Sequence, residues 1–329
     1  MKYKNWLLNW LENYVKSSVK MRTYERYYQI CNLHIIPFLG EYNMDEISVL
    51  DLQKFIAMLL TSGNHKTGNG LSANFVNTVI SVVQNSLKTA YLIGLIPKYV
   101  ADKIKRPKKV EKPVNCFSTL EQKKIEEYVL KSSNDKLFGV VLCLYTGIRI
   151  GELLALTWKD IDLEKGILFV SKTCYDGNDG ENYIRIIDTP KTSCSCRIIP
   201  LPKQILPLLK ALKERLKCEY VIVDNGKPVF VRSYQRTFEL MLKKIGIPNK
   251  CFHSLRHTFA TRAIECGMDV KTLSEVLGHK NATITLNRYV HSLFEHKIDM
   301  MNRLGMLLYN RGGTSNKSFD VPPEFIITH

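Results

Sequence analysis

Histidine and arginine residues in the last third of the chain have the types and spacing that chemistry on a phosphate requires. The segment Cys251-Phe-His-Ser-Leu-Arg-His places His253 and Arg256 three residues apart at the start of a predicted helix, so that both side chains should point the same way. Free N–H groups at a helix N-terminus and a planar guanidinium both suit a phosphate. The structural alternative is a core histidine and a surface ion pair.

A tyrosine follows on the next predicted helices. One helix ends at Gly278, His279 lies in the loop after it, and Thr283 is predicted to cap the helix that carries Tyr289. A lone tyrosine is as consistent with packing in the core as with chemistry. Tyr289 gains meaning only together with the basic residues upstream.

Three patterns that resemble metal sites are each incomplete. His253 and His257 have the i, i+4 spacing of zinc-binding helices, but Ser254 stands where such helices carry a glutamate. Cys194-Ser-Cys196 lacks the second ligand pair of a tetrahedral zinc site. The two aspartates of Trp158-Lys-Asp-Ile-Asp162 lack the further carboxylate of a two-metal nuclease, and a turn before a strand explains them. The sequence predicts no metal and no cofactor.

The composition favours a polyanionic partner. The 329 residues carry 47 Lys and Arg against 31 Asp and Glu, a net charge of +16, which suits nucleic acid or an anionic membrane. Apolar runs stay below the roughly 18 residues of a membrane span, and nine cysteines are an odd number without CxxC pairs. We expect a cytoplasmic protein with reduced thiols and no membrane association.

The first hundred residues predict helices, and a basic segment follows them. A helix capped by Thr23 is expected to run toward Gly40, and a capping box at Ser48 and Asp51 is expected to open another helix. Residues 1–101 are therefore expected to form a helical domain. Residues 102–114, rich in Lys and broken by prolines, are interpreted as a linker, either simply solvated or following a phosphate backbone.

The remainder mixes helices with a few short strands. Ser118 opens a helix, and period-two patterns predict strands at 167–171, 183–188 and 197–201 with turns at 177–180 and 189–193. Helices should resume near residue 202 and continue to 308. We expect a second domain over residues 115–310 and a flexible tail over 311–329. The fold class is thus mainly α with a small antiparallel β-sheet (α+β).

Five short motifs occur in order within about 140 residues. They are Thr146-Gly-Ile-Arg-Ile-Gly-Glu, Pro190-Lys-Thr-Ser-Cys-Ser-Cys-Arg-Ile-Ile-Pro200, His253-Ser-Leu-Arg-His, Leu277-Gly-His and Arg288-Tyr-Val-His. Together they resemble the tyrosine recombinase (phage integrase) family. The resemblance implies a catalytic domain over residues 115–310 and, by pattern and position alone, a helical SAM-like domain over residues 1–101 that binds the DNA core site.

The resemblance also implies roles for two groups of residues. Arg149 and Arg256 would hold the non-bridging oxygens of the scissile phosphate, and His279 would donate a hydrogen bond to it. Tyr289 would attack phosphorus to form a 3′-phosphotyrosyl bond.

Two further residues would move protons. His253 would act as the base that deprotonates the tyrosine, and Lys191 as the acid that protonates the departing 5′-oxygen. Neither metal nor ATP is required. Ordinary alternatives remain, such as an ion pair between Arg149 and Glu152, and an exposed turn position for Lys191.

The family's partners set further expectations. They are double-stranded DNA, a homotetramer on two DNA sites and an accessory directionality factor. A helix near 293–308, with Ile298, Met301, Leu304 and Leu308 on one side, would dock on a neighbouring subunit or pack in its own domain. The first helix begins close to Met1, so we expect the two-domain layout without an arm-binding domain.

Two other functions fit the same DNA-binding features. One is a regulator on the same scaffold that does not cut DNA, and the other is a type IB topoisomerase, which shares the chemistry but needs no recombination site. The order of the motifs favours a site-specific recombinase that integrates, excises or inverts DNA.

Overall fold

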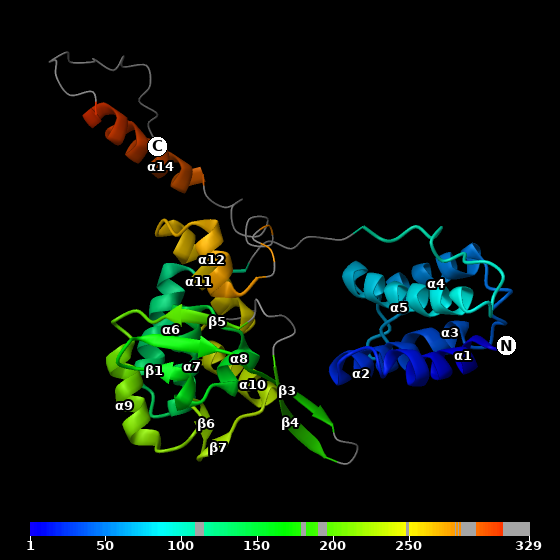
Figure 1. Cartoon of the computed structure of the whole chain (residues 1–329), viewed down its shortest axis with the longest axis horizontal. Coiled ribbons are helices and arrows are strands. Elements are labelled where there is room, and N and C mark those ends of the chain that lie inside the picture. The colour runs from blue at the N-terminus through cyan, green and yellow to red at the C-terminus, as the bar shows by residue number, and fades with distance from the viewer. Residues whose placement is uncertain are drawn as a thin grey trace. The chain divides into compact units, whose positions relative to one another are not determined.

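The computed structural model describes residues 1–108, 115–178, 182–189, 196–247, 250–279, 281, 283 and 294–311. The chain divides into two compact units, Met1–Pro113 and Val114–His329 (Figure 1). Each unit has an apolar core of its own. The fold is mainly helical with small antiparallel sheets, which confirms the predicted α+β class.

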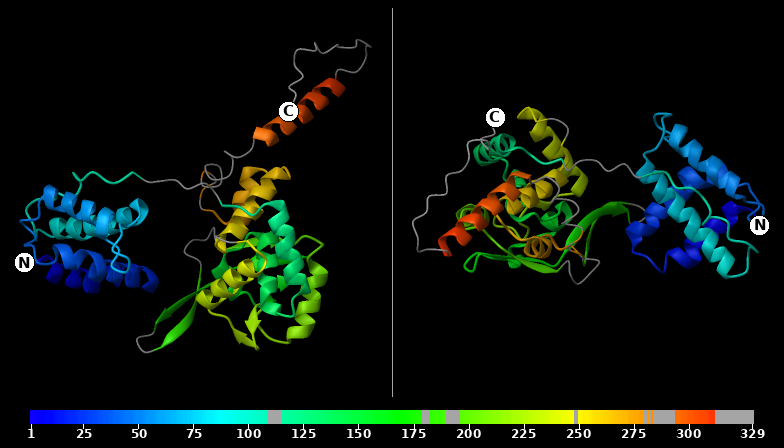
Figure 2. Two further views of the ribbon diagram at one scale, coloured as in Figure 1. Left: turned by 180° about the vertical axis from the view of Figure 1, so that it is seen from behind. Right: turned by 90° about the horizontal axis from the view of Figure 1, so that it is seen from above.

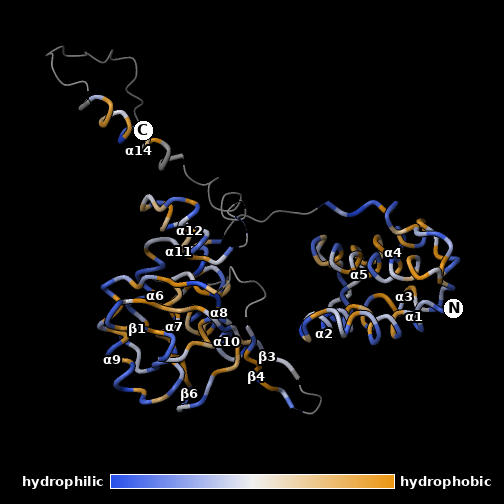
Figure 3. The backbone as a smooth tube through the Cα atoms, viewed as in Figure 1, coloured by the Kyte–Doolittle hydropathy of each residue, from blue (hydrophilic) through white to orange (hydrophobic). Residues whose placement is uncertain are grey.

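The described part of the first unit is helical. Its elements are α1 (Tyr3–Trp10), η1 (Leu11–Val15), α2 (Met21–Ile30), η2 (Cys31–Ile35), α3 (Ile36–Leu39), α4 (Val49–Ser62) and α5 (Ala73–Leu92). Hydrophobic and hydrophilic residues alternate along these helices (Figure 3), as expected where one face of each helix packs inward.

Aromatic side chains of α1 fasten it to α5. The Tyr3 hydroxyl lies 2.6 Å from Oγ of Ser86, Nε1 of Trp6 donates to the Ser86 carbonyl at 3.1 Å, and Nε1 of Trp10 donates to Thr89 Oγ1 at 3.1 Å. These donors are spaced by one and two helical turns, so a single face of α1 is both apolar and hydrogen-bonded.

The helix caps in this unit were predicted with mixed success. The capping box of Ser48 and Asp51 is confirmed, with each side chain bonded to the other's backbone amide. The prediction that Thr23 caps the second helix is wrong, because that helix already begins at Met21 after the extended Lys20. Thr23 therefore lies inside the first turn, where its amide donates to the Lys20 carbonyl.

Residues 102–108, predicted as the first half of the linker, pack against the first unit. Ile104 is buried in its core. The side chain of Gln53 on α4 exchanges two hydrogen bonds with the backbone of Lys105, at 3.1 and 3.3 Å. This segment therefore has fixed partners on the helical unit and is not simply solvated.

The second unit contains helices around short strands. Its helical elements are α6 (Thr119–Lys131), η3 (Asp135–Leu137), α7 (Phe138–Thr146), α8 (Ile150–Ala155), η4 (Trp158–Asp160), α9 (Leu206–Leu216), α10 (Val231–Lys244), α11 (His253–Glu265), α12 (Val270–Leu277) and α14 (Phe294–Arg311). Its strands are β1 (Ile161–Asp162), β2 (Ile167–Val170), β3 (Thr173–Asn178), β4 (Tyr183–Asp188), β5 (Arg197–Pro200), β6 (Val223–Asp224) and β7 (Lys227–Pro228). Among the described residues, no helix is long and apolar enough to cross a membrane.

The strands form three antiparallel sheets. The order β1–β2–β5 makes the largest sheet, in which Val170 of β2 pairs with Arg197 of β5. β3 and β4 form a separate ribbon, which Figure 2 shows projecting from the body of the unit. The carboxylate of Asp176 ties this ribbon to α10, because it accepts from the amides of Val231 and Arg232 at 2.9 and 2.8 Å.

Strands were predicted less completely than helices. The three predicted strands are present as β2, β4 and β5. The turn predicted at 177–180 is wrong in its first half, because Gly177 and Asn178 belong to β3 and pair with Ile184 and Tyr183. The hairpin β6–β7 interrupts the region predicted as helices alone. Strands of two residues, or with Gly and Asp inside, carry too little period-two pattern to be recognised.

The core of the second unit surrounds α7. All of its residues except Tyr145 are buried, and it ends at Gly147, which takes the left-handed conformation. A Cβ at Gly147 would lie 2.4 Å from the ring of Phe259 on α11. Glycine at 147 therefore allows α11 to approach the end of α7.

Candidate active site

The helix that carries His253 and Arg256 begins where the sequence predicted. His253 is the first residue of α11 and is exposed, whereas Arg256, one turn later, is only 2% exposed. The His253 ring lies edge-on to the His257 ring, with centroids 4.5 Å apart. α11 therefore presents an imidazole at the surface and holds a guanidinium in the interior.

The guanidinium of Arg256 joins two chain segments that are distant in sequence. Nη1 donates to the carbonyl of Gly147 at 2.8 Å, and Nη2 donates to the carbonyl of Leu277 at 2.6 Å. These two carbonyls end α7 and α12, where helices leave acceptors unsatisfied. Arg256 therefore fixes the end of α12 against the residues that precede Arg149.

Arg149 occupies the cap position of α8. Its amide donates to Glu152 Oε2 at 2.8 Å and its Nη1 donates to Oε1 at 2.8 Å, so the ion pair considered from the sequence is present. Nη2 also donates to the carbonyl of Gly278 at 3.3 Å. The Arg149 side chain is 35% exposed. Of the two arginines, Arg149 is the one that solvent, and hence an anion, reaches directly.

Glu152 is held by two arginines. Nη1 and Nη2 of Arg197 donate to its two oxygens at 3.1 and 2.8 Å, and each of these oxygens also accepts a bond from Arg149. Burial opposes the ionised form of Glu152, but hydrogen bonds and charge from Arg197, and then the charge of Arg149, lower its pKa from the usual 4.5 to about 2. Glu152 is therefore ionised at neutral pH despite being 5% exposed.

His279 follows directly on the end of α12. Gly278 takes the left-handed conformation that ends the helix, and the His279 amide donates to the Ser274 carbonyl at 3.0 Å. The Asn281 side-chain oxygen accepts from the amide of Thr283 at 2.9 Å. Asn281 thus occupies the capping role predicted for Thr283, which is itself helical.

The structure describes four of the six predicted site residues. Arg149 and Arg256 bond to consecutive carbonyls at the end of α12, and His279 is the next residue along the chain. His253 lies one turn before Arg256 on α11. Lys191 and Tyr289, together with Cys194, lie outside the described residues.

Arg197 is a site residue that was not predicted. It stands in the motif Pro190–Pro200, which drew attention for Lys191 alone. The available signal was the alternation of β5, in which Ile199 is buried and its period-two partner Arg197 shares the inward face. An inward-facing arginine needs partners for its charge and its N–H groups, and both oxygens of Glu152 accept from Arg197.

Metal binding finds no support in the part of the chain that is described. No cluster of three or more His, Cys, Asp and Glu there suits a metal ion. The Asp160 carboxylate accepts from the amide of Thr157 at 2.8 Å, and Asp162 accepts from the amides of Glu164 and Lys165. Both aspartates therefore serve local turns.

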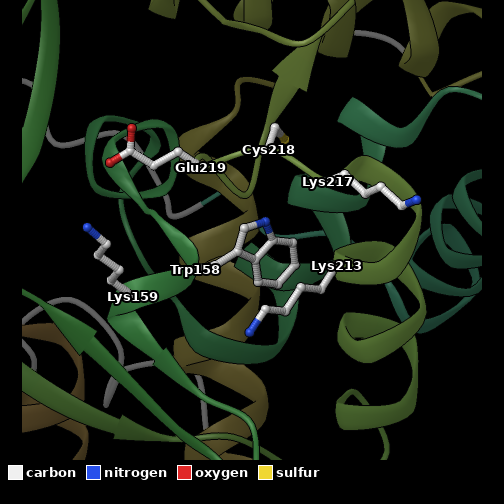
Figure 4. A pocket seen from close by; sticks show the side chains of 6 residues that line it. All are labelled: Trp158, Lys159, Lys213, Lys217, Cys218 and Glu219. Atoms are coloured by element: carbon white, nitrogen blue, oxygen red, sulfur yellow. The ribbon is translucent and has the colours of Figure 1, made fainter.

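The second unit also contains a pocket that none of the predicted site residues lines (Figure 4). It is lined by Trp158, Lys159, Lys213, Lys217, Cys218 and Glu219. Nζ of Lys213 lies 6.0 Å from the centroid of the Trp158 ring. None of these six residues is a predicted site residue, so this pocket is separate from the arginine site.

Comparison with known proteins identifies both regions of the chain. The phage integrase family matches residues 118–296, and the phage integrase N-terminal SAM-like domain matches residues 2–60. A protein from Caldanaerobacter subterraneus named tyrosine recombinase XerC-like is 33% identical over 259 residues. That alignment covers 69% of this chain and 66% of the relative, slightly less than two thirds of its length.

Solved structures share the fold. The Tn1549 transposon integrase in complex with transposon right end DNA matches with a TM-score of 0.78 at 24% identity, over 93% of this chain and all of that chain. A lambda integrase tetramer bound to a Holliday junction matches with a TM-score of 0.65 at 20% identity, over 86% and 79% of the two chains. The family match spans more than half of the 329 residues and includes the arginine site. The chain therefore belongs to the phage integrase family.

Proposed function

We propose that this protein cuts and rejoins DNA at specific sites through a 3′-phosphotyrosyl bond to Tyr289, and so integrates, excises or inverts a DNA segment. The observation that carries the proposal is the meeting of Arg149 and Arg256 at consecutive carbonyls of one helix end, directly before His279. Two guanidiniums at one helix end, with a histidine as the next residue along the chain, suit a phosphate that gains negative charge in its transition state.

The two arginines act on the phosphate in different ways. Arg149, with 35% of its side chain exposed, contacts the non-bridging oxygens of the scissile phosphate. Arg256 is buried at the same helix end, and its charge acts on that phosphate through a medium of lower dielectric than water. His279 donates a hydrogen bond from the adjacent loop.

The covalent step transfers two protons: one leaves the attacking tyrosine, and another is given to the departing oxygen. The Tyr289 phenol oxygen attacks phosphorus, and its proton passes to His253, which is exposed on α11. The bond from phosphorus to the 5′-oxygen breaks, and Lys191 protonates this leaving group. Rejoining reverses these transfers. The phosphotyrosyl bond retains the free energy of the diester, so rejoining needs no ATP. The arginines supply the positive charge that a metal ion supplies in other nucleases, so we propose that no metal takes part.

The exposed apolar face of α14 is the feature of this chain that suits assembly with other copies. Ile298, Met301 and Leu304 are 46%, 66% and 48% exposed, an apolar stripe at helical spacing. We infer that this stripe packs on a neighbouring protomer when four copies bind two DNA sites in the cytoplasm. An accessory directionality factor then selects between integration and excision.

The test is trapping of the covalent intermediate. Duplexes selected from a random-sequence pool by binding to Tyr289→Phe are nicked, so that a cleaved strand cannot rejoin, and are incubated with wild type or Tyr289→Phe in EDTA without ATP. We expect a protein–DNA adduct from wild type and none from Tyr289→Phe, at equal DNA affinity. Binding by both proteins without an adduct from either would favour a non-catalytic regulator. Cleavage by wild type without sequence preference would favour a topoisomerase.

A further inference from the structure

Three arginines meet the carbonyls that end α12. Arg197 Nε donates to Val276 at 2.6 Å, Arg256 donates to Leu277 at 2.6 Å, and Arg149 donates to Gly278 at 3.3 Å. The last carbonyls of a helix lack partners within it and carry the negative end of its dipole. Each of these three consecutive carbonyls is therefore satisfied by a different cation.

Arg197 differs from Arg149 in its surroundings. Its side chain is 6% exposed, against 35% for Arg149, so it is enclosed by protein. Beyond its bond to Val276 it donates through both terminal nitrogens to Glu152. Glu152 in turn accepts from the amide and Nη1 of Arg149. A continuous chain of charge-assisted hydrogen bonds thus runs from Arg197 through Glu152 to Arg149.

We propose that Arg197 is a positioning residue for DNA strand cleavage: it holds Glu152 and the end of α12 so that Arg149 and His279 face the scissile phosphate. The inference rests on the proposed function. It deepens that function by assigning part of the site to a residue that acts through others, since its 6% exposure leaves it unsuited to contact DNA.

Charge balance supports this assignment. One carboxylate stands between two guanidiniums, so Glu152 neutralises one of them and a net positive charge remains for the phosphate. Arg197 binds both oxygens of Glu152 at once. Without Arg197, the charge of Glu152 would cancel that of Arg149, and the positive potential left for the phosphate would fall.

The backbone before His279 rests on the same side chain. A Cβ at Gly278 would lie 3.0 Å from Cδ and Nη1 of Arg197 and 3.2 Å from its Nε. Gly278 itself has a φ of +62°. The turn that leads into His279 therefore lies directly against Arg197, and a movement of this arginine would shift both His279 and the carbonyl that Arg149 contacts.

The titration of Glu152 supplies a specific signature. The groups that face it are Arg149 at the cap of α8, Arg197 from β5 and the buried thiol of Cys143 from α7. Loss of Arg197 removes the strongest influence that lowers the Glu152 pKa, so this pKa should rise. Protonated Glu152 no longer holds Arg149. On the plot of cleavage rate against pH, the fall in rate on the acidic side (the acidic limb) should therefore begin at a higher pH.

The experiment compares single-turnover cleavage of the nicked duplex by the full chain and its variants between pH 5 and 9. The variants are Arg197→Met, Arg197→Lys, Glu152→Gln, the double variant Arg197→Met with Glu152→Gln, and Arg215→Met as the matched control. Arg215 pairs with Asp135 and is 60% exposed, so its loss removes the same charge away from the site. DNA affinity and thermal unfolding are measured for each.

We expect Arg197→Met to lower the cleavage rate about 10- to 100-fold at unchanged DNA affinity and to shift the acidic limb upward, with Arg197→Lys between it and wild type. Arg215→Met should match wild type. In the Glu152→Gln background, Arg197→Met should cost less than in wild type, because the two residues act as one unit.

Specific results would overturn the inference. These are a wild-type rate and pH profile in folded Arg197→Met, or an equal cost of Arg197→Met with and without Glu152→Gln. If Arg197→Met does not fold, an unchanged rate and pH profile in Arg197→Lys overturns it instead. Absence of an adduct from wild type overturns the proposed function and this inference with it, whereas wild-type cleavage with unaffected variants overturns the inference alone.

Discussion

The two units of this chain bury different kinds of residues. Among described residues, the buried polar side chains of the first unit are the neutral Asn77 and Ser86, whereas the second unit also buries Glu152, Arg256 and His257. Burying charge costs free energy unless every partner is in place, and apolar residues of similar volume often stabilise as well or better. The difference indicates that apolar packing and hydrogen bonds between neutral groups hold the first unit, while the second keeps charges in its interior, where we propose the phosphate site.

The largest effect that tests this contrast should come from Arg149→Ala. Loss of the exposed guanidinium should lower the rate of adduct formation about 10³-fold, because it removes a donor aimed at charge that develops in the transition state. DNA affinity should change little, because the net charge of +16 leaves many other basic residues to attract the phosphate backbone. Single-turnover cleavage at saturating DNA measures the rate, and Arg215→Met serves as the control. If Arg149→Ala cleaves DNA as fast as wild type, Arg149 is not a residue of the active site.

A matched change in the apolar core of the first unit should affect stability instead. Leu52 on α4 is 1% exposed, and Leu52→Ala should destabilise this unit by about 3 kcal/mol through lost burial and a residual cavity. Hydrogen exchange of α4 and α5 amides reports on this unit separately from the second. At saturating DNA the adduct rate should equal that of wild type. A slower covalent step in folded Leu52→Ala would mean that the first unit also shapes the reaction.

The Glu152 carboxylate predicts how stability depends on pH. Its folded pKa of about 2 lies below the usual 4.5, so its contribution is complete above pH 4.5 and is lost as the pH falls toward 2. The contribution is at most about 3 kcal/mol. Urea unfolding of wild type and Glu152→Gln between pH 6 and pH 2 measures it. The stability difference between the two proteins should shrink as the pH falls, and a constant difference would contradict the role of Glu152.

The sequence predicted best those features that depend on residues close together in the chain. Side chains that cap helices act within three residues, so the sequence predicted the helix starts at Ser48 and Ser118. Capping boxes with Asp51 and Glu121 are present at the two starts. The helix end at Gly278 was predicted from an equally local signal, and the structure confirms it. Local signals were sufficient for most of the helical architecture in both units.

The charged network of the second unit was not readable in this way. The bonds of Arg197 to Glu152 and to the end of α12 span 45 and 79 residues of sequence. Nothing in the residues around Arg197 specifies these partners, since they depend on how β5 and α12 pack. The order of the motifs pointed to Arg149 and Arg256. Arg197, which connects them to the sheet, could be recognised only once the fold was known.

The smallest expected effect compares two glycines with positive φ, one in each unit. Gly68 in the first unit has a φ of +70°, and a Cβ added there would have no atom within 4 Å, whereas a Cβ at Gly278 would press on Arg197 at 3.0 Å. Alanine at either position should cost about 1 kcal/mol for the left-handed backbone. Gly68→Ala should therefore lower stability alone. Gly278→Ala should lower the adduct rate as well, because it displaces Arg197 beside His279, and equal adduct rates in the two variants would show that the end of α12 tolerates such a shift.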